Sequence, residues 1–419
     1  MTQIEQAWGA GPSARYEDLA KRFRHIFAHI RETAVTRDID RSLPHEEIGW
    51  LRAAKFTKLR VPTDEGGLGA TLPELFNLLI ELSAADPNVT NALRSHFGFT
   101  EDILVSPFPA YRQTWLKRIA RGDTAGSGHS ETGDAKVTAF STRLIRQDDH
   151  WLLNGKKYYT TGSLFADWIN LAAADEAGEV IGAQVPTQAP GVTILDDWNG
   201  FGQALTASGT VIFKDVVITE DLINPSRQRF RYSTAFFQLV HLATLAGIAR
   251  AATDDVSRLV SERRRIYSHG NADSVAADPQ ILQVVGTVRS AAYSAGAIVL
   301  KAAESVQRTH EAYFLGDADG LDAAIAIADL EIDQAVTTVT DLVLDATTRL
   351  FDALGASAAD RNNGLDRHWR NARTITSHNP RIYRSRIVGD FAVNGKWPPG
   401  AYRVGEPVSR LETASGEVA

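Results

Sequence analysis

The chain has 419 residues, enough for about two or three structural units around a large buried core. Its 44 basic and 51 acidic residues give a net charge of -7, which excludes a general nucleic-acid-binding surface. Cysteine is absent, which excludes disulfides, thiolate catalysis and cysteine-ligated metal sites.

The N-terminal stretch has no basic segment followed by an apolar one, and no run of about 18 apolar residues occurs in the sequence. Hydrophobic residues make up 44% of the chain, a proportion ordinary for a soluble globular protein. We therefore expect no secretion signal, no membrane partner and a cytoplasmic location.

Apolar residues at helical spacing mark the first part of the chain. Those in the stretch 14–34 are Leu19, Phe23, Ile26, Phe27 and Ile30. A shorter helix is expected within 43–56, and two more within 72–99, separated near Pro87. We predict an N-terminal helical domain over residues 1–120.

The pattern changes after residue 120. Short runs rich in β-branched and aromatic residues, separated by Gly, Asn, Asp and Pro, predict a central antiparallel β-barrel or sandwich over residues 121–225. Helical spacing then returns and predicts a C-terminal helix bundle over 226–400, followed by a tail over 401–419. Its three long helices are expected at 234–268, 279–312 and 320–353. The fold class is therefore α+β.

Several common sites are missing from the sequence. No Walker loop occurs, and "GFG" at residues 200–202 does not continue as a dinucleotide fingerprint, so a nicotinamide site within the chain is not expected. No HExxH motif or close cluster of His, Asp and Glu indicates a metal site.

Four segments carry the remaining chemistry: "AGSGHSETGD" (125–134), "LNGKKYYTTG" (153–162), "DDWNGFGQALTASG" (196–209) and "DRHWRNARTITSHNP" (366–380). Small and hydroxylic residues in the first offer hydrogen-bond donors to an anionic or heteroaromatic ligand. From the residues alone, the favoured interpretation of each segment is an ordinary one: a linker, a strand, a loop or a solvated basic helix end.

Taken in order, these segments resemble the acyl-CoA dehydrogenase fold family along nearly the whole chain. "VPTDEGGLGATLPEL" is similar to its Pro-x-x-x-Gly-Gly-x-Gly loop, and "GSGHSETGD" stands where the family has a flavin-binding Thr-Glu-Pro loop. "LNGKKYYTTG" is similar to its Asn-Gly-x-Lys-x-Trp-Ile-Thr strand, and "WRNAR" to Arg-Asp-Ala-Arg. The resemblance implies a flavoprotein.

One departure from the family concerns the catalytic base. Many dehydrogenases of this fold have a Glu shortly after Arg-Asp-Ala-Arg, which removes the α-proton of an acyl thioester. Here His378 or Asn379 stands at that position, and no carboxylate occurs between Asp366 and Asp390. A histidine with a pKa near neutrality suits proton work beside a reduced flavin. The chain thus resembles the flavin-dependent monooxygenase branch, including dibenzothiophene monooxygenases and relatives in sulfone metabolism.

This resemblance implies specific roles for site residues. His96, His378, Ser127 and Thr161 would be catalytic, with the two histidines flanking the flavin ring and its peroxide. Ser127, Thr161, His129, Tyr159, Trp198, Arg263, Arg265 and Arg370 would contact the cofactor. Arg263 or Arg265 would bind the FMN phosphate across a subunit boundary. The shortened glycine pattern in "ALGASAADRNNG" (353–364) favours FMN, with FAD as the alternative.

The implied function is the oxygenase component of a two-component FMN-dependent monooxygenase. Reduced FMN from a separate NAD(P)H-flavin reductase would react with O2 to form a hydroperoxide at C4a. This would oxygenate a small apolar or aromatic substrate, a class that includes sulfur-containing compounds. Phe97, Phe99, Phe236 and Phe237 agree with such a substrate, although core packing explains them equally well. The resemblance also implies a homotetramer, a dimer of dimers.

Two alternatives stay open. The first is an FAD-dependent acyl-CoA dehydrogenase with a relocated catalytic base on a bundle helix. The second is a relative without catalytic activity. His129 is a departure from the monooxygenase pattern, which has a small residue there, and it would narrow the pocket or change the substrate.

Overall fold

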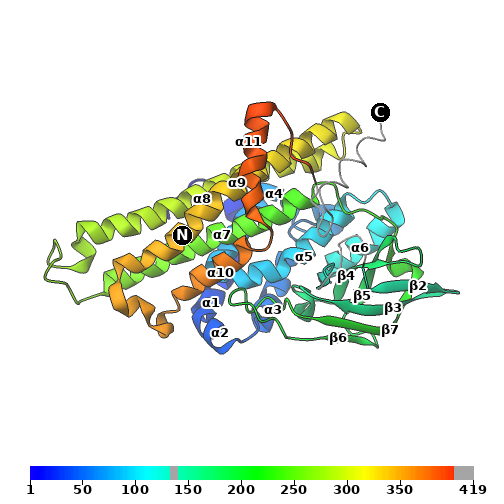
Figure 1. The fold of residues 1–419 in the computed structure, drawn as a ribbon, viewed down its shortest axis with the longest axis horizontal. Helices are drawn as coiled ribbons and strands as arrows, with labels where there is room; N and C mark the ends of the chain where they lie inside the picture. The colour runs from blue at the N-terminus through cyan, green and yellow to red at the C-terminus, as the bar shows by residue number, and fades with distance from the viewer. Residues whose placement is uncertain (133–139, 401–419) are drawn as a thin grey trace.

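The computed structural model describes residues 1–132 and 140–400 and shows an α+β fold. Helices, then strands, then long helices follow one another along the chain (Figure 1). The strands lie at one end of an elongated helix bundle. The predicted tail over 401–419 and the last two residues of the 125–134 segment lie outside the described residues.

Helices occupy the N-terminal part of the chain. They are α1 Tyr16–Glu32, α2 Ala34–Asp40, α3 His45–Ala53, α4 Leu72–Ala85, α5 Pro87–Leu104 and α6 Pro109–Arg121. The predicted break near Pro87 is present, because Asp86 caps α5 by accepting a hydrogen bond from Asn88 N and Pro87 occupies its first turn. Pro87 thereby ends α4 and sets the direction of α5, the helix on which the candidate site is built.

The strands of the described residues form one eight-stranded sheet. They are β1 Ala125–Gly128, β2 Arg143–Gln147, β3 His150–Lys157, β4 Trp168–Ala174, β5 Val180–Pro186, β6 Val192–Ile194, β7 Val211–Thr219 and β8 Ile223–Asn224. Most neighbours run antiparallel, as expected, whereas β4 pairs in parallel with both β1 and β2. Alternate residues of β7 are buried, which places one face of the strand on a core shared with α5 and α6.

Three long helices build the bundle: α7 Ser233–Glu262, α8 Pro279–Ala312 and α9 Ala318–Arg349. The helix α7 ends six residues before the predicted boundary at 268, because Arg263 adopts an extended conformation at the start of a run of three arginines. Its length and apolar composition would suit a membrane span, yet 94% of its most apolar window is buried within the protein. It is therefore the central helix of the bundle, in contact with α4, α8 and α9.

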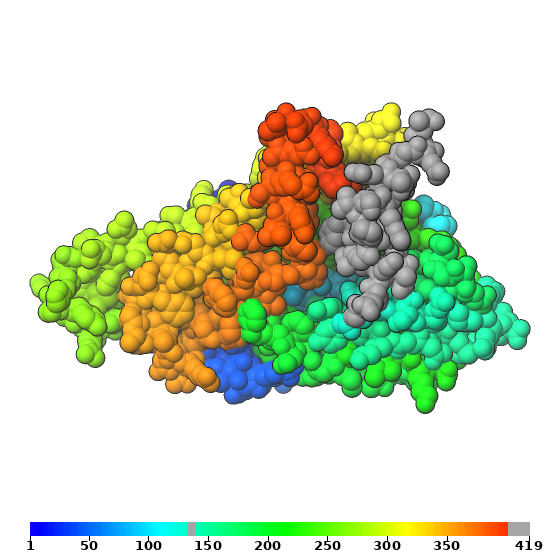
Figure 2. Space-filling view, viewed as in Figure 1, coloured from blue at the N-terminus to red at the C-terminus, as the bar shows by residue number. Residues whose placement is uncertain are grey.

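Two shorter helices complete the described chain, α10 Asp366–Thr376 and α11 Arg384–Asn394. The helix α10 packs on α7 and α9 and lies beside the strand region. The helix α11 has no buried residue and projects from the bundle as a separate ridge (Figure 2). The loop 377–383 between them carries His378.

Candidate active site

The helix α5 connects the two halves of the candidate site. Asn88, Ala92 and His96 follow one another at four-residue spacing and face the loops of the strand region, where the side chain of Asn88 accepts a hydrogen bond from Leu205 N. Arg94 lies on a different face of the helix and contacts α7 and the end of α10. One helix thus positions groups in the strand region and in the bundle.

A glycine fixes the strand region against α5. Gly162 has φ +82°, and a β carbon at this position would lie 2.2 Å from the carbonyl oxygen of Ala92. Only glycine allows both the left-handed backbone and this close approach. As a result Thr161, the neighbouring residue, is held next to the helix.

A chain of buried hydroxyl groups extends from Thr161. Its Oγ1 lies 2.7 Å from Ser208 Oγ, which lies 2.7 Å from Thr206 Oγ1, and the Thr206 hydroxyl donates to the carbonyl of Gln203. Ser127 N donates to the carbonyl of Thr161 at 3.1 Å. The structure therefore brings Ser127 and Thr161 together, as the sequence suggested.

An aromatic group lies at the edge of this cluster. The rings of Tyr159 and Trp198 are 5.9 Å apart in an edge-to-face arrangement, and Tyr158 contacts both. Tyr159 is 46% exposed and has φ +59°, an unusual conformation for a residue with a side chain. Its ring thus offers a free face to a planar ligand.

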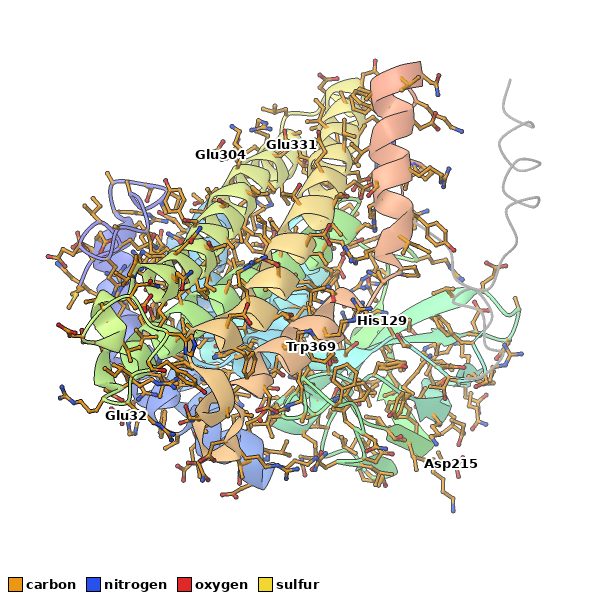
Figure 3. All side chains as sticks on the ribbon, turned by 60° about the vertical axis from the view of Figure 1, so that its left-hand side comes forward. Glu32, His129, Asp215, Glu304, Glu331 and Trp369 are labelled. Atoms are coloured by element: carbon orange, nitrogen blue, oxygen red, sulfur yellow. The ribbon has the colours of Figure 1, made fainter. Side chains whose placement is uncertain are left out.

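His129 follows β1 and lies at the junction of the strands and the bundle, as does Trp369 of α10 (Figure 3). Its Nε2 is buried and has no hydrogen-bond partner among the described residues. Burial, followed by the charges of Arg229 and Lys157, holds the pKa of the imidazole well below its usual value. His129 is therefore a neutral side chain, two residues after Ser127, with one ring nitrogen unpaired among the described residues.

A buried ion pair supports this segment. Glu131 accepts from Lys157 Nζ at 2.7 Å, and also from the backbone amides of Ser141 and Thr142 and the Ser141 hydroxyl. Despite burial, these contacts lower the pKa of Glu131 to about 2. Glu131 thereby fastens the end of the 125–132 segment to β2 and β3.

His96 is held by the main chain on both sides of its ring. Its Nε2 lies 2.8 Å from the carbonyl of Thr57, and Ala125 N donates to Nδ1 at 3.4 Å. Burial lowers its pKa to about 4. The expected contact of His96 with a peroxide stays a prediction. The hydrogen bonds of both ring nitrogens disfavour it, because they leave neither nitrogen available to the peroxide.

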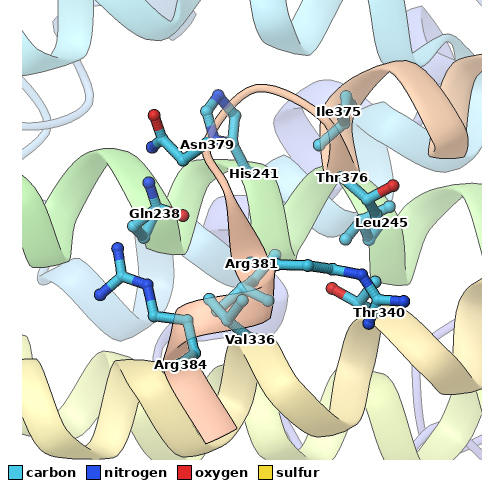
Figure 4. A pocket seen from close by; sticks show the side chains of 11 residues that line it. Gln238, His241, Leu245, Val336, Thr340, Ile375, Thr376, Asn379, Arg381 and Arg384 are labelled. Atoms are coloured by element: carbon cyan, nitrogen blue, oxygen red, sulfur yellow. The ribbon is translucent and has the colours of Figure 1, made fainter. Parts of the chain in front are cut away.

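His378 lies on the bundle side, in a buried cluster with Arg94 and His241. Arg94 Nη1 lies 3.0 Å from His378 Nε2 and also bonds to His241 Nε2, and the two imidazole centroids are 4.5 Å apart. Burial first, and then the charge of Arg94, lowers the pKa of His378 to about 3. Figure 4 shows His241 and Asn379 at one side of a narrow pocket between α7, α9 and α10.

The predicted arginines lie elsewhere. Arg370 bonds to Asp38, Asp366 and the carbonyl of Phe201, so its guanidinium already has partners within the chain. Arg263 follows the C-terminal end of α7 and donates to the carbonyl of Arg265. This segment lies at the end of the bundle opposite the strands (Figure 1). Within one chain, neither Arg263 nor Arg265 joins the hydroxyl cluster.

Other expected features have ordinary roles. Phe97, Phe99 and Phe236 are buried in the core, and Phe237 is partly buried against Gly98.

A hollow of about 370 Å³ lies between α6, the 62–70 loop and the end of α8, where Arg15 and Arg60 pair with Glu74 and Glu101. Among residues 1–132 and 140–400, no three His, Asp or Glu side chains are grouped to hold a metal.

The sequence interpretation missed Arg94 and His241. Both are polar residues within buried, largely apolar helices, at 8% and 5% exposure. A charged or imidazole group is costly to bury unless it has a specific partner. The presence of Arg94 in "NALRSHFGF" and of His241 in "FFQLVHLATLA" therefore indicated a buried polar contact. The partners of Arg94 and His241 could not be predicted, because they lie far away in the sequence.

The ring half of a flavin fits these residues. The Ser127 side chain is half-buried and its hydroxyl makes no hydrogen bond within the described part of the chain. Together with Thr161, it offers donors and acceptors at the edge of a planar ring. Tyr159 and Trp198 offer aromatic contact.

Comparison with known proteins identifies the family of the chain. The acyl-CoA dehydrogenase middle domain matches residues 129–216, and the acyl-CoA dehydrogenase C-terminal domain matches residues 239–380. A probable FMNH2-dependent monooxygenase, SfnC of Pseudomonas putida, is 27% identical over 392 residues, covering 90% of this chain and 95% of that protein. A dibenzothiophene monooxygenase of Mycolicibacterium goodii is 26% identical over 409 residues, covering 93% and 97%.

A solved structure shows the same similarity in three dimensions. FMN-bound TdsC from Paenibacillus sp. A11-2 superposes with a TM-score of 0.83 at 25% sequence identity. The match covers 91% of this chain and 98% of that chain. Similarity therefore extends over all three structural parts rather than one domain.

Proposed function

Because the chain belongs to the acyl-CoA dehydrogenase fold family and its relatives include FMN-dependent monooxygenases, we propose that it is the oxygenase component of a two-component FMN-dependent monooxygenase. Reduced FMN supplies the electrons that activate O2, and one oxygen atom goes to the substrate while the other leaves as water. A separate NAD(P)H-flavin reductase supplies the reduced flavin.

The cluster around His378 is the observation that carries this proposal. A dehydrogenase needs a base to remove an α-proton, and a base is effective when its pKa lies near the working pH. The pKa of His378 lies at about 3, and that of His241 also lies well below its usual value. Neither imidazole suits proton abstraction at neutral pH, whereas a neutral imidazole suits hydrogen-bond donation to oxygen.

The relocated base of the competing proposal would be a carboxylate on a bundle helix. The carboxylates of α7 are Asp254, Asp255 and Glu262, all in its C-terminal half. Asp254 and Asp255 form ion pairs with Arg31, and Asp255 also pairs with Arg367. These contacts give Asp254 and Asp255 a structural role, so neither aspartate of α7 is available as the relocated base.

The remaining site residues have roles in binding and orientation. Ser127 and Thr161 would hold the polar edge of the flavin ring, and Tyr159 and Trp198 would contact its face. His129 would border the space left for the substrate, and its buried Nε2 has no hydrogen-bond partner among the described residues. A small apolar or aromatic compound, including one with sulfur, suits this setting and agrees with the relative named for dibenzothiophene.

The functional unit is proposed to be a homotetramer in the cytoplasm. Apolar side chains remain exposed on α8 and around α11, among them Tyr293, Ile382 and Val393. Exposed apolar side chains of this kind are suited to contact between copies of the chain. Assembly would also bring Arg263 or Arg265 of one copy to the FMN phosphate of another.

The proposal is tested by mixing the full chain with a flavin reductase, NADH, FMN and O2 carrying an isotope label. The expected result is transfer of labelled oxygen into a thiophene or sulfide probe, dependent on both proteins. A chain that instead oxidises acyl-CoA thioesters with bound FAD, without O2 incorporation, would establish the dehydrogenase alternative.

A further inference from the structure

Arg94 contacts two histidines with one nitrogen. Its Nη1 carries two hydrogens and lies within hydrogen-bond distance of His378 Nε2 and His241 Nε2. The two rings lie side by side with an angle of 52° between their planes. Arg94, His241 and His378 come from α5, α7 and the loop after α10, so three separate elements meet at this nitrogen.

This geometry determines where the ring protons are. A guanidinium has donors and no acceptor, so each Nε2 that it contacts must be the accepting nitrogen. The single proton of each neutral imidazole then lies on Nδ1. A proton on Nε2 of either ring would face an N–H of Arg94, and an imidazolium would add a second buried positive charge.

The surrounding charges do not change this conclusion. Within residues 1–132 and 140–400, the charged and titratable groups that face the cluster are Arg94 of α5, His241 of α7, and Arg381 and Arg384 of the segment after α10. Arg381 is paired with Asp341, and Arg384 with Asp333, both on α9. The side chain of Asn379 favours protonation of His378, although burial and Arg94 outweigh it.

We propose that Arg94 is a positioning residue: it fixes His378 and His241 in the Nδ1–H form and so makes His378 a hydrogen-bond donor through Nδ1. The consequence of this positioning for catalysis rests on the proposed monooxygenase function. A histidine held in this way keeps one protonation state over the physiological pH range. His241 serves as the second acceptor, which holds the guanidinium in place.

The histidine protonation states can be measured directly in the flavin-free, full-length protein. Histidine labelled with 15N gives ring-nitrogen signals that distinguish the two neutral forms and the imidazolium. The chain has 11 histidines, so spectra of His378→Gln and His241→Gln identify the two signals. The expected result is the Nδ1–H form for both, with no titration of His378 between about pH 5 and 8.

Variants of Arg94 test the cause. Arg94→Gln removes the positive charge, so the pKa of His378 should rise and the Nδ1–H preference should weaken. Arg94→Lys returns a positive charge and should restore the low pKa without the two-acceptor geometry. Arg22 is exposed and forms no hydrogen bond or ion pair within the described part of the chain. Arg22→Gln is therefore the matched control, expected to leave both histidine signals unchanged.

Activity gives a separate readout. For Arg94→Gln, kcat should fall about 10- to 100-fold, the loss seen when a partner that orients a functional histidine is removed, with KM for the substrate little changed. Its pH profile should also gain a decline on the acid side that the wild type lacks. A purely structural role would lower the amount of folded protein without this new pH dependence.

The outcomes separate this inference from the proposed function. A wild-type spectrum showing the Nε2–H form, or a His378 titration unchanged in Arg94→Gln, would overturn the role of Arg94. Once the two signals are identified, the wild-type spectrum needs no Arg94 variant, so it decides even when Arg94→Gln does not fold. An Nδ1–H spectrum in a protein that oxygenates nothing would leave the positioning role intact and contradict the monooxygenase function.

Discussion

The backbone amide of Gln203 donates a 2.6 Å hydrogen bond to Oδ1 of Asn371. Both residues are buried, at 2% and 1% exposure. This contact joins the 196–209 loop, which carries Trp198, to α10, which leads to His378. The strand side and the bundle side of the candidate site are therefore connected by this buried hydrogen bond, and also by the one from Arg370 to the carbonyl of Phe201.

We expect Asn371→Ala to weaken that connection. The amide of Gln203 would stay buried without an acceptor, at a cost of about 1–3 kcal/mol in the free energy of unfolding. Affinity for reduced FMN should also fall, because the loop that bears Trp198 loses one of its buried attachments to α10. Urea unfolding and anaerobic flavin titration measure the two effects.

Asn199 provides the matched control, since it is exposed and lies in the same loop. Asn199→Ala should change neither stability nor flavin affinity. Equal behaviour of the two alanine variants would show that the Gln203–Asn371 contact does not position the loop.

His378→Ala tests the proton-holding group. We expect it to bind reduced FMN normally, because the hydroxyl cluster and the aromatic pair are on the strand side of α5. Oxygenation should be lost, with the consumed O2 appearing as hydrogen peroxide. The ratio of product to peroxide measures this uncoupling, and a wild-type ratio would remove His378 from the chemistry.

The hydroxyl groups of Ser127 and Thr161 are expected to contact the flavin ring. Removing one hydrogen bond of this kind costs about 0.5–1.5 kcal/mol, so Ser127→Ala and Thr161→Ala should each weaken reduced-FMN binding by about 2- to 13-fold. Thr161→Ala also removes the bond to Ser208 and should have the larger effect. Anaerobic titration of flavin fluorescence measures the affinity, and unchanged affinity in both variants would contradict the assigned contacts.

The lowered pKa of Glu131 predicts that the free energy of unfolding depends on pH. Its folded pKa lies at about 2, below the ordinary value of 4.5, so its ion pair contributes stability above pH 4.5 that is lost as the pH falls towards 2. Glu131→Gln should therefore be less stable than the wild type at neutral pH, with the difference shrinking in acid. Urea midpoints measured across this range test it, and a constant difference would exclude the linkage.

Much of the fold could be predicted from the sequence. Leu19, Phe23, Phe27 and Ile30 are buried on one face of α1, as their spacing indicated, and Pro87 separates α4 from α5. The parallel pairing of β1 with β4 could not be predicted, because alternation of apolar residues shows which face is buried but not which strand is the neighbour.

The candidate site was only partly predictable. Ser127 and Thr161 belong to recognisable motifs, and the structure places them together. The cluster of Arg94, His241 and His378 joins residues up to 284 positions apart in sequence, and this closeness depends on how α5, α7 and α10 pack. Similarly, Arg370 matches a family motif, yet its partner Asp38 belongs to α2 and could not be foreseen.

The reaction of bound reduced FMN with O2 tests the central claim most directly. The protein is mixed anaerobically with reduced FMN, then with O2, and the return of oxidised flavin is followed by rapid absorbance measurements with and without a sulfur-containing aromatic probe. We predict that oxidised flavin returns more slowly than in buffer and that the probe is oxygenated. Return at the rate seen in buffer, with all O2 recovered as peroxide and no oxygenated probe, would contradict the assignment as a monooxygenase.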